Sequence, residues 1–209
     1  LGNANKMMNR LLRSSSENFD IRISSIDGGS LRNAIPRESV AIIAVDENQL
    51  AAFEADFQDV ASAIQVEYNS LEENLSITAE KTDLPDNVMN MEAQQELIKA
   101  ISAAHNGVYR MSPEIENLVE TSNNIARVIV KDGSIKIGCL TRSSVDSTKD
   151  DLANAIIATF ELANFDVALS GDYPGWAPNM ASPILKVLEA KYKEINNEDP
   201  HVAACHAGL

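Results

Sequence analysis

The chain reads Phe19-Asp20-Ile21-Arg22-Ile23-Ser24-Ser25-Ile26-Asp27-Gly28-Gly29 across its first apolar run of period two. Alternation of apolar and polar side chains is typical of a strand with one buried face, and an Asp-Gly-Gly sequence ends such a strand in a turn. A second strand is predicted at 39–45. Another strand pair is predicted at 124–130 and 134–140, joined by Asp132-Gly133. The Asp27-Gly28 and Asp132-Gly133 pairs therefore mark equivalent points in two similar halves.

Helices are predicted on both sides of each strand pair, because apolar residues recur there at spacings of three and four. Their ranges are 3–12, 48–66, 92–104 and 150–163. Short apolar runs at 75–79 and 165–169 each predict one more strand. The order α-β-β-α-β then occurs twice, over about 1–85 and 90–172. We predict an α+β fold: a two-layer sandwich of duplicated ferredoxin-like halves, with helices on one face of an antiparallel sheet.

Residues 173–209 follow neither half. The loop at 170–179 is rich in Pro and Gly, Pro183 suits the first turn of a helix running to about residue 195, and a strand is predicted at 201–204. The chain also begins without Met and stops directly after an apolar run. We interpret it as a piece of a longer polypeptide, in which 173–209 starts a second, incomplete domain.

Composition excludes several classes of function. The 209 residues contain 17 Lys and Arg against 31 Asp and Glu, a net charge of −14, so an interface with nucleic acid is not expected. No apolar run is long enough to cross a bilayer, which favours the cytoplasm and no contact with a membrane. Cys139 and Cys205 lie in apolar segments, where buried unreactive thiols are expected rather than a disulfide.

Few residues are candidates for chemistry. The three histidines are scattered, so we predict neither a metal site nor a catalytic residue within this chain. Asn33 follows the glycine pair, where an amide could face a ligand; a turn-forming asparagine is the alternative. Arg142 ends a predicted strand, where a guanidinium can bind a carboxylate through two hydrogen bonds. A surface ion pair explains Arg142 equally well at this point.

Six stretches in order along the chain resemble the aminoacyl-histidine dipeptidase family, a branch of the di-zinc metallopeptidases that include carnosinase. They are Gly2-Asn3-Ala4-Asn5-Lys6, the run from Ile26 to Glu38, Val119-Glu120-Thr121-Ser122-Asn123-Asn124, Leu140-Thr141-Arg142-Ser143-Ser144, Tyr173-Pro174-Gly175-Trp176 and His206-Ala207-Gly208-Leu209. The resemblance therefore covers nearly the whole chain.

The resemblance implies a cytosolic homodimeric hydrolase that cleaves Xaa-His and related dipeptides with two zinc ions. A lid is inserted into its catalytic domain; residues 1–172 correspond to the lid and 173–209 to the returning catalytic segment. Asn33 matches an asparagine that binds substrate, Arg142 the arginine that pairs with the substrate carboxylate, and Gly208 a glycine whose backbone lines the site. The zinc ligands belong to absent segments, so this chain alone is expected to bind no metal and to be inactive.

Two other functions stay open from the residues themselves. Asn33 and Arg142 could serve a duplicated regulatory module that binds an amino acid. Alternatively, the chain could be a purely structural dimerisation domain, since the exposed edges of such sheets can pair across a two-fold axis.

Overall fold

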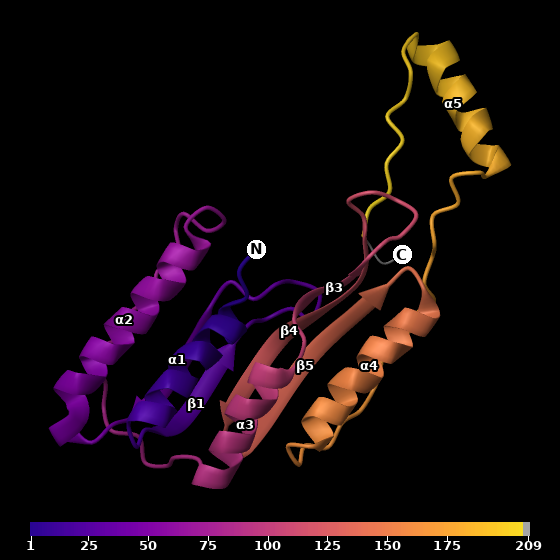
Figure 1. Cartoon of the computed structure of the whole chain (residues 1–209). Coiled ribbons are helices and arrows are strands. Elements are labelled where there is room, and N and C mark those ends of the chain that lie inside the picture. The colour runs from indigo at the N-terminus through magenta and orange to yellow at the C-terminus, as the bar shows by residue number, and fades with distance from the viewer. Residues whose placement is uncertain (207–209) are drawn as a thin grey trace.

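The computed structural model describes residues 1–206, in which one sheet is covered by helices (Figure 1). The elements are α1 (Ala4–Asn18), β1 (Arg22–Gly28), β2 (Ser39–Ala44), the single 3-10 turn η1 (Glu47–Gln49), α2 (Leu50–Tyr68), α3 (Met91–Ala103), β3 (Gly107–Met111), β4 (Val119–Lys131), β5 (Ser134–Ser143), α4 (Asp146–Glu161) and α5 (Pro183–Asn196). Helix–hairpin–helix order occurs twice, as α1-β1-β2-α2 and as α3-β4-β5-α4, with β3 added before the second hairpin.

The long strand β4 organises the sheet, and all of its neighbours run antiparallel to it. β5 pairs along almost the whole of β4, from Thr121↔Ser143 to Lys131↔Ser134. On the other edge, β3 pairs with the first half of β4 and β1 with residues 128–130. β2 pairs only with β1, so it forms an outer edge of the sheet.

The gap between β3 and β1 along β4 is closed by the start of α1. The side chains of Asn3 and Asn5 both donate to the carbonyl of Ile125, at 3.1 and 3.2 Å. A strand carbonyl that no neighbouring strand can reach is thereby satisfied, which avoids the cost of a buried unpaired backbone group.

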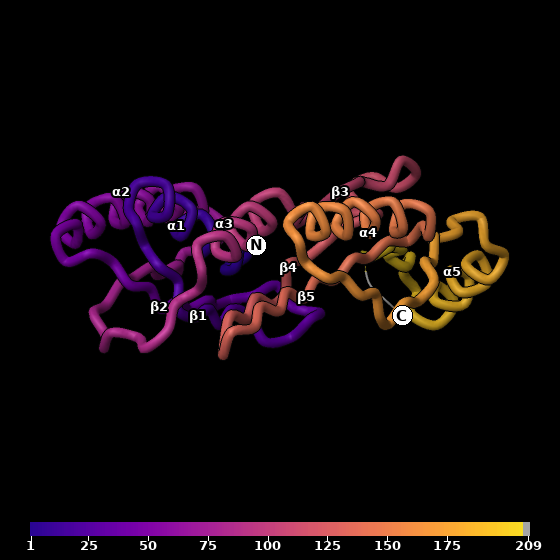
Figure 2. Tube along the Cα trace, turned by 90° about the horizontal axis from the view of Figure 1, so that it is seen from below, coloured from indigo at the N-terminus to yellow at the C-terminus, as the bar shows by residue number. Residues whose placement is uncertain are grey.

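Helices α1, α2, α3 and α4 lie in one layer on one side of the sheet (Figure 2), and the predicted α+β two-layer sandwich is confirmed. The main core lies between the layers, where Ile23, Ile125 and Leu152 are fully buried. A smaller apolar cluster joins α1 to α2 through Leu11 and Ile64. The three-to-four spacing in the helices and the alternation in β1 therefore point the expected side chains inward.

Three of the predicted strands do not form among the described residues: 75–79, 165–169 and 201–204 are irregular. Leu75 and Ile77 instead pack on the α1–α2 cluster, and Phe165 packs edge-on against Phe160 of α4. Short apolar runs can cover helices as well as pair with strands, and their sequences do not distinguish the two uses. The strand β3 was not predicted. Its residues Val108 and Met111 are exposed, so the strand has no buried apolar face that would mark it in the sequence.

Candidate functional site

Asn33 lies in a tight turn within the loop that joins β1 to β2. The turn is closed by a bond from the backbone N–H of Ala34 to the carbonyl of Leu31, at 3.2 Å, and Asn33 is exposed beside it. The side chain of Asn124 on β4 donates to the carbonyl of Ala34, at 2.8 Å, while its own oxygen accepts from Asn3, at 3.0 Å. Asn33 is thus a turn residue, and its loop is fixed to β4 and to the start of α1.

The far side of the same loop is held by an ion pair. Arg37 donates to Glu72 at 2.8 Å, and the backbone N–H of Gly2 donates to the same carboxylate at 2.7 Å. The bond from Arg37, together with the one from Gly2, lowers the pKa of Glu72 to about 2. The loop that presents Asn33 is therefore restrained at both of its ends at neutral pH.

Arg142 is on β5 directly opposite Ser122 of β4. Thr121, the neighbour of Ser122, bonds to Thr148 of α4 at 3.0 Å, so Thr121 points toward the helices and Ser122 and Arg142 point to the opposite face. The Nε atom of Arg142 is buried and has no hydrogen-bond partner among residues 1–206. Within the same residues Arg142 takes part in no ion pair, unlike a typical surface arginine.

The two candidate residues come to one region of the sheet. Asn124, which holds the Asn33 loop, is two positions along β4 from Ser122, the cross-strand partner of Arg142. Two strand residues span about 7 Å, so the loop is anchored within the length of a small ligand from the Arg142 position. The face on which they lie is the one that α1 to α4 leave open (Figure 2).

A third side chain reaches this region from the end of the described chain. Nε2 of His206 is 2.8 Å from the hydroxyl of Ser122. Burial lowers the pKa of His206, and the positive charge of Arg142 lowers it further, against a hydrogen bond to the backbone of Val119 that raises it. Sequence reasoning did not include His206 among the site residues, although it begins the matching stretch His206–Leu209. Gly208 lies outside the described residues.

The two cysteines differ in their surroundings. Burial raises the pKa of Cys139 to about 11, so its thiol stays protonated at neutral pH and is not a nucleophile. Cys205 is exposed, which contradicts the prediction of a buried thiol; its segment forms no strand and packs against no core. Neither cysteine forms a disulfide within the part of the chain that is described.

Metal-ligating residues do not gather in this fold. Over residues 1–206, no group of three or more His, Cys, Asp or Glu side chains is placed to hold a metal ion. The zinc ions implied by the resemblance therefore have no fitting site among the described residues. Within the same range, no helix is long and apolar enough to cross a membrane.

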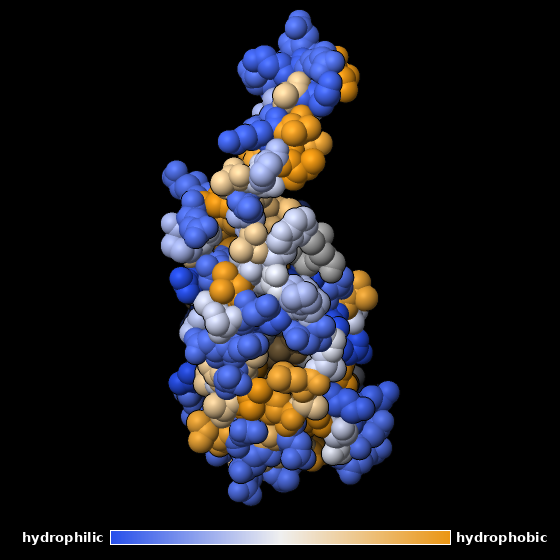
Figure 3. Space-filling model, turned by 90° about the vertical axis from the view of Figure 1, so that its right-hand side faces the viewer, coloured by the Kyte–Doolittle hydropathy of each residue, from blue (hydrophilic) through white to orange (hydrophobic). Residues whose placement is uncertain are grey.

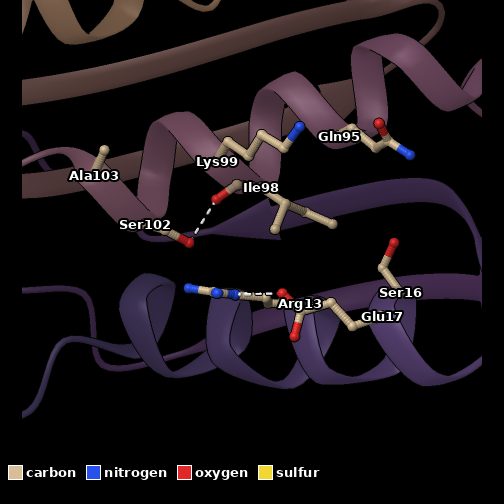
Figure 4. Close-up of a pocket in the computed structure, with 8 residues that line it drawn as sticks. All are labelled: Arg13, Ser16, Glu17, Gln95, Ile98, Lys99, Ser102 and Ala103. Atoms are coloured by element: carbon tan, nitrogen blue, oxygen red, sulfur yellow. Dashed lines mark hydrogen bonds and ion pairs between the residues drawn. The ribbon is translucent and has the colours of Figure 1, made fainter.

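A groove of about 550 Å³ lies in the helix layer, on the other side of the sheet from Arg142. Its walls are α1, which supplies Arg13 and Glu17, and α3, which supplies Ile98 and Lys99 (Figure 4). Arg13 is paired with Glu17 at 2.8 Å. None of the residues predicted to bind substrate lines this groove, so the open face of the sheet remains the candidate site.

Comparisons with known proteins find relatives of this chain in sequence and in structure. Residues 1–72 match the family described as the peptidase dimerisation domain. This match covers about a third of the chain. The whole chain is 33% identical over 209 residues to the cytosol non-specific dipeptidase of Escherichia coli (strain K12), and this alignment covers 100% of the chain and 43% of the relative.

The whole chain also matches a solved structure, the aminoacylhistidine dipeptidase from Vibrio alginolyticus. The TM-score is 0.93 at 33% identity, over 100% of this chain and 42% of that one. Both named relatives are dipeptidases, and the resemblance predicted from the sequence is confirmed. The chain spans less than half the length of either relative.

Proposed function

We propose that residues 1–172 are the substrate-positioning lid of a dipeptidase. In this proposal Arg142 binds the free carboxylate of a dipeptide, Asn33 hydrogen-bonds the substrate, and the backbone of Gly208 lines the same site. The observation that carries the proposal is the Nε of Arg142, which is buried on the open face without a partner among residues 1–206. A buried guanidinium N–H without an acceptor is costly, and a substrate carboxylate would offset that cost.

Such a lid contributes position rather than bond-breaking chemistry. A peptide of three residues would present an amide, instead of an anion, at the point where a dipeptide presents its carboxylate. An arginine held at a fixed distance from the hydrolytic centre therefore selects dipeptides, because only their anion reaches it. The two zinc ions would be bound by parts of the protein outside this chain, and residues 173–209 would return toward those parts.

Other features of the whole protein follow in the same proposal. The intact enzyme would hydrolyse Xaa-His and related dipeptides in the cytoplasm, as a homodimer. The name of one relative includes "cytosol", which supports the location. The name of the other includes "aminoacylhistidine", which supports the substrate class. The free edge strand β2 would be available for contact with the second copy.

Replacing Arg142 in the full-length enzyme tests the proposal. Arg142→Ala should lower kcat/KM for a dipeptide by roughly 30- to 1000-fold, the effect of losing about 2–4 kcal/mol from a desolvated charge pair. Cleavage of the same dipeptide with an amidated C-terminus should change less than threefold, because that substrate has no anion to bind.

Lys136→Ala is the matched control, since Lys136 is an exposed cation on the same strand and the same face. Lys136→Ala should leave kcat/KM unchanged for both substrates. An equal loss for the free and the amidated dipeptide in Arg142→Ala would overturn the carboxylate role and favour a structural one.

A further inference from the structure

The segment after α5 returns to the sheet and is hydrogen-bonded to it through one side chain. In Figure 1 the chain leaves the sandwich after α4, forms α5 away from it, and comes back beside β3 and β4. Of the hydrogen bonds found within residues 1–206, those that join 176–206 to the strands both involve His206, one with Ser122 and one with the backbone of Val119. The position of this returning segment on the sheet therefore depends on His206.

The contact falls on the part of the sheet that carries the candidate site. Ser122 is the cross-strand partner of Arg142, and the charge of Arg142 acts on the His206 ring. His206 is also hydrogen-bonded to the backbone of Val119. The ring is thus held at two points of β4, one of which, Ser122, is the cross-strand partner of Arg142.

The surroundings favour the neutral form of the ring. An imidazolium next to Arg142 would be repelled, and it would have no lone pair to accept a bond from the Ser122 hydroxyl. A neutral ring can donate from one nitrogen to the backbone of Val119 and accept from Ser122 at Nε2. This arrangement fixes the Ser122 hydroxyl and leaves Arg142 as the positive group that faces an anion.

We propose that His206 is a positioning residue for the carboxylate clamp: by bonding to Ser122 it seats the returning segment against β4 and sets its distance from Arg142. This inference rests on the proposed function. If the hydrolytic centre lies on the body from which this segment comes, the His206 contact fixes the spacing between that centre and Arg142. The contact would then control how well a dipeptide reaches from the hydrolytic centre to Arg142.

The test uses the full-length enzyme, with a free dipeptide and its C-terminal amide as substrates. His206→Ala should raise KM for the free dipeptide about tenfold, the loss of one half-buried hydrogen bond, and change kcat less than twofold. KM for the amide should stay within twofold. His206→Gln, which keeps a hydrogen-bonding group at the reach of Nε2, should recover KM to within threefold of the wild type.

Two further variants complete the design. Ser122→Ala removes the partner while keeping the imidazole, and it should reproduce the KM effect even if His206→Ala folds poorly. His201→Ala changes an exposed histidine of the same segment and should have no effect on either substrate.

The outcomes separate the two proposals. If Arg142→Ala abolishes the preference for the free carboxylate and both His206→Ala and Ser122→Ala leave KM unchanged, the role of His206 is overturned and the lid function stands. If His206→Gln is as impaired as His206→Ala, or both substrates lose kcat equally, positioning through this hydrogen bond is also overturned. If Arg142→Ala does not alter the preference either, the lid function itself is overturned.

Discussion

Gly29 and Gly133 adopt similar left-handed conformations, with φ of +74° and +72°, in very different surroundings. A Cβ at Gly29 would lie 2.0 Å from the carbonyl oxygen of Ala126, whereas a Cβ at Gly133 would meet nothing within 4 Å. Gly133 is the second residue of a two-residue hairpin turn, open to solvent. Gly29 instead lies where the chain leaves β1 in close contact with β4.

We therefore expect Gly29→Ala to be much more destabilising than Gly133→Ala. The exposed turn should lose about 1 kcal/mol from backbone strain alone, and the crowded position about 3 kcal/mol because β1 and β4 must separate. Urea unfolding followed by circular dichroism measures both losses. Equal shifts of the two midpoints would show that the close approach to Ala126 relaxes at little cost.

Single residues also mark the limit of inference from the sequence. The apolar residues of period two in β1 were predictable, because only their spacing matters. Gln94 was not: it is fully buried, and it accepts from the backbone of Ile23 at 2.8 Å and donates to Ile21 at 3.0 Å. A polar side chain that replaces missing strand partners has no sequence signature, because its partners are set by the tertiary fold.

At the scale of elements, β2 has a free edge. It pairs only with β1, and it exposes Val40 and Ile42 to 63% and 37%. β2 itself contains no proline and no charged residue, so nothing along the strand prevents it from pairing with another strand. Residues 1–72, which include β2, match the family described as the peptidase dimerisation domain, and this similarity agrees with an edge-to-edge contact.

Ile42→Lys should therefore weaken a homodimer of the full-length protein without unfolding it. Sedimentation at several concentrations would show a mass shifted toward the monomer, while the melting temperature of the fold changes little. Val66→Lys provides the comparison, since Val66 is an exposed β-branched apolar residue on α2, away from the sheet edge. A mass that falls equally in both variants, or in neither, would remove β2 as the interface.

Elements were predicted best where the residues within and next to the element carry the signal. The helices α2, α3 and α5 begin and end within a few residues of the predicted ranges, because caps and spacing are local signals. α1 continues to Asn18 through serines that were expected to end it, since Ser15 is buried and Ser14 bonds to Asp56 of α2 at 3.0 Å. Contacts between elements, which local sequence does not encode, decided that boundary.

At the scale of the whole molecule, the sequence predicts candidate residues but not where they lie. Asn33 and Arg142 stay predictions from their chemistry and from the family resemblance, while their positions on the sheet depend on the pairing of β4 with β5 and on the side chain of Asn124. The contact of His206 depends on a return of the chain over 60 residues after β5. Long-range pairings of this kind leave no trace in local spacing.

The helix α5 lies away from the sandwich (Figure 1). None of its residues is buried, and an apolar stripe made of Ile184, Val187, Leu188, Tyr192 and Ile195 is open to solvent. Figure 3 shows such apolar side chains exposed on the projecting part of the molecule. A helix with one apolar stripe normally buries it, so we expect the remainder of the longer protein to cover this face.

Val187→Asp should then act only in the full-length protein. In that protein the carboxylate would be buried in an apolar interface without a positively charged partner. The substitution should therefore cost about 3 kcal/mol of stability and lower the melting temperature by several degrees.

In the isolated chain Val187 is 54% exposed. Surface substitutions typically change stability by about 0.5 kcal/mol or less, so the same change should shift the melting temperature by less than one degree. Lys186→Asp places the same charge one position away on the polar side and should be tolerated in both. A full-length protein that tolerates Val187→Asp as well as Lys186→Asp would mean that α5 stays exposed, and that the segment 173–206 does not belong to the body that the lid covers.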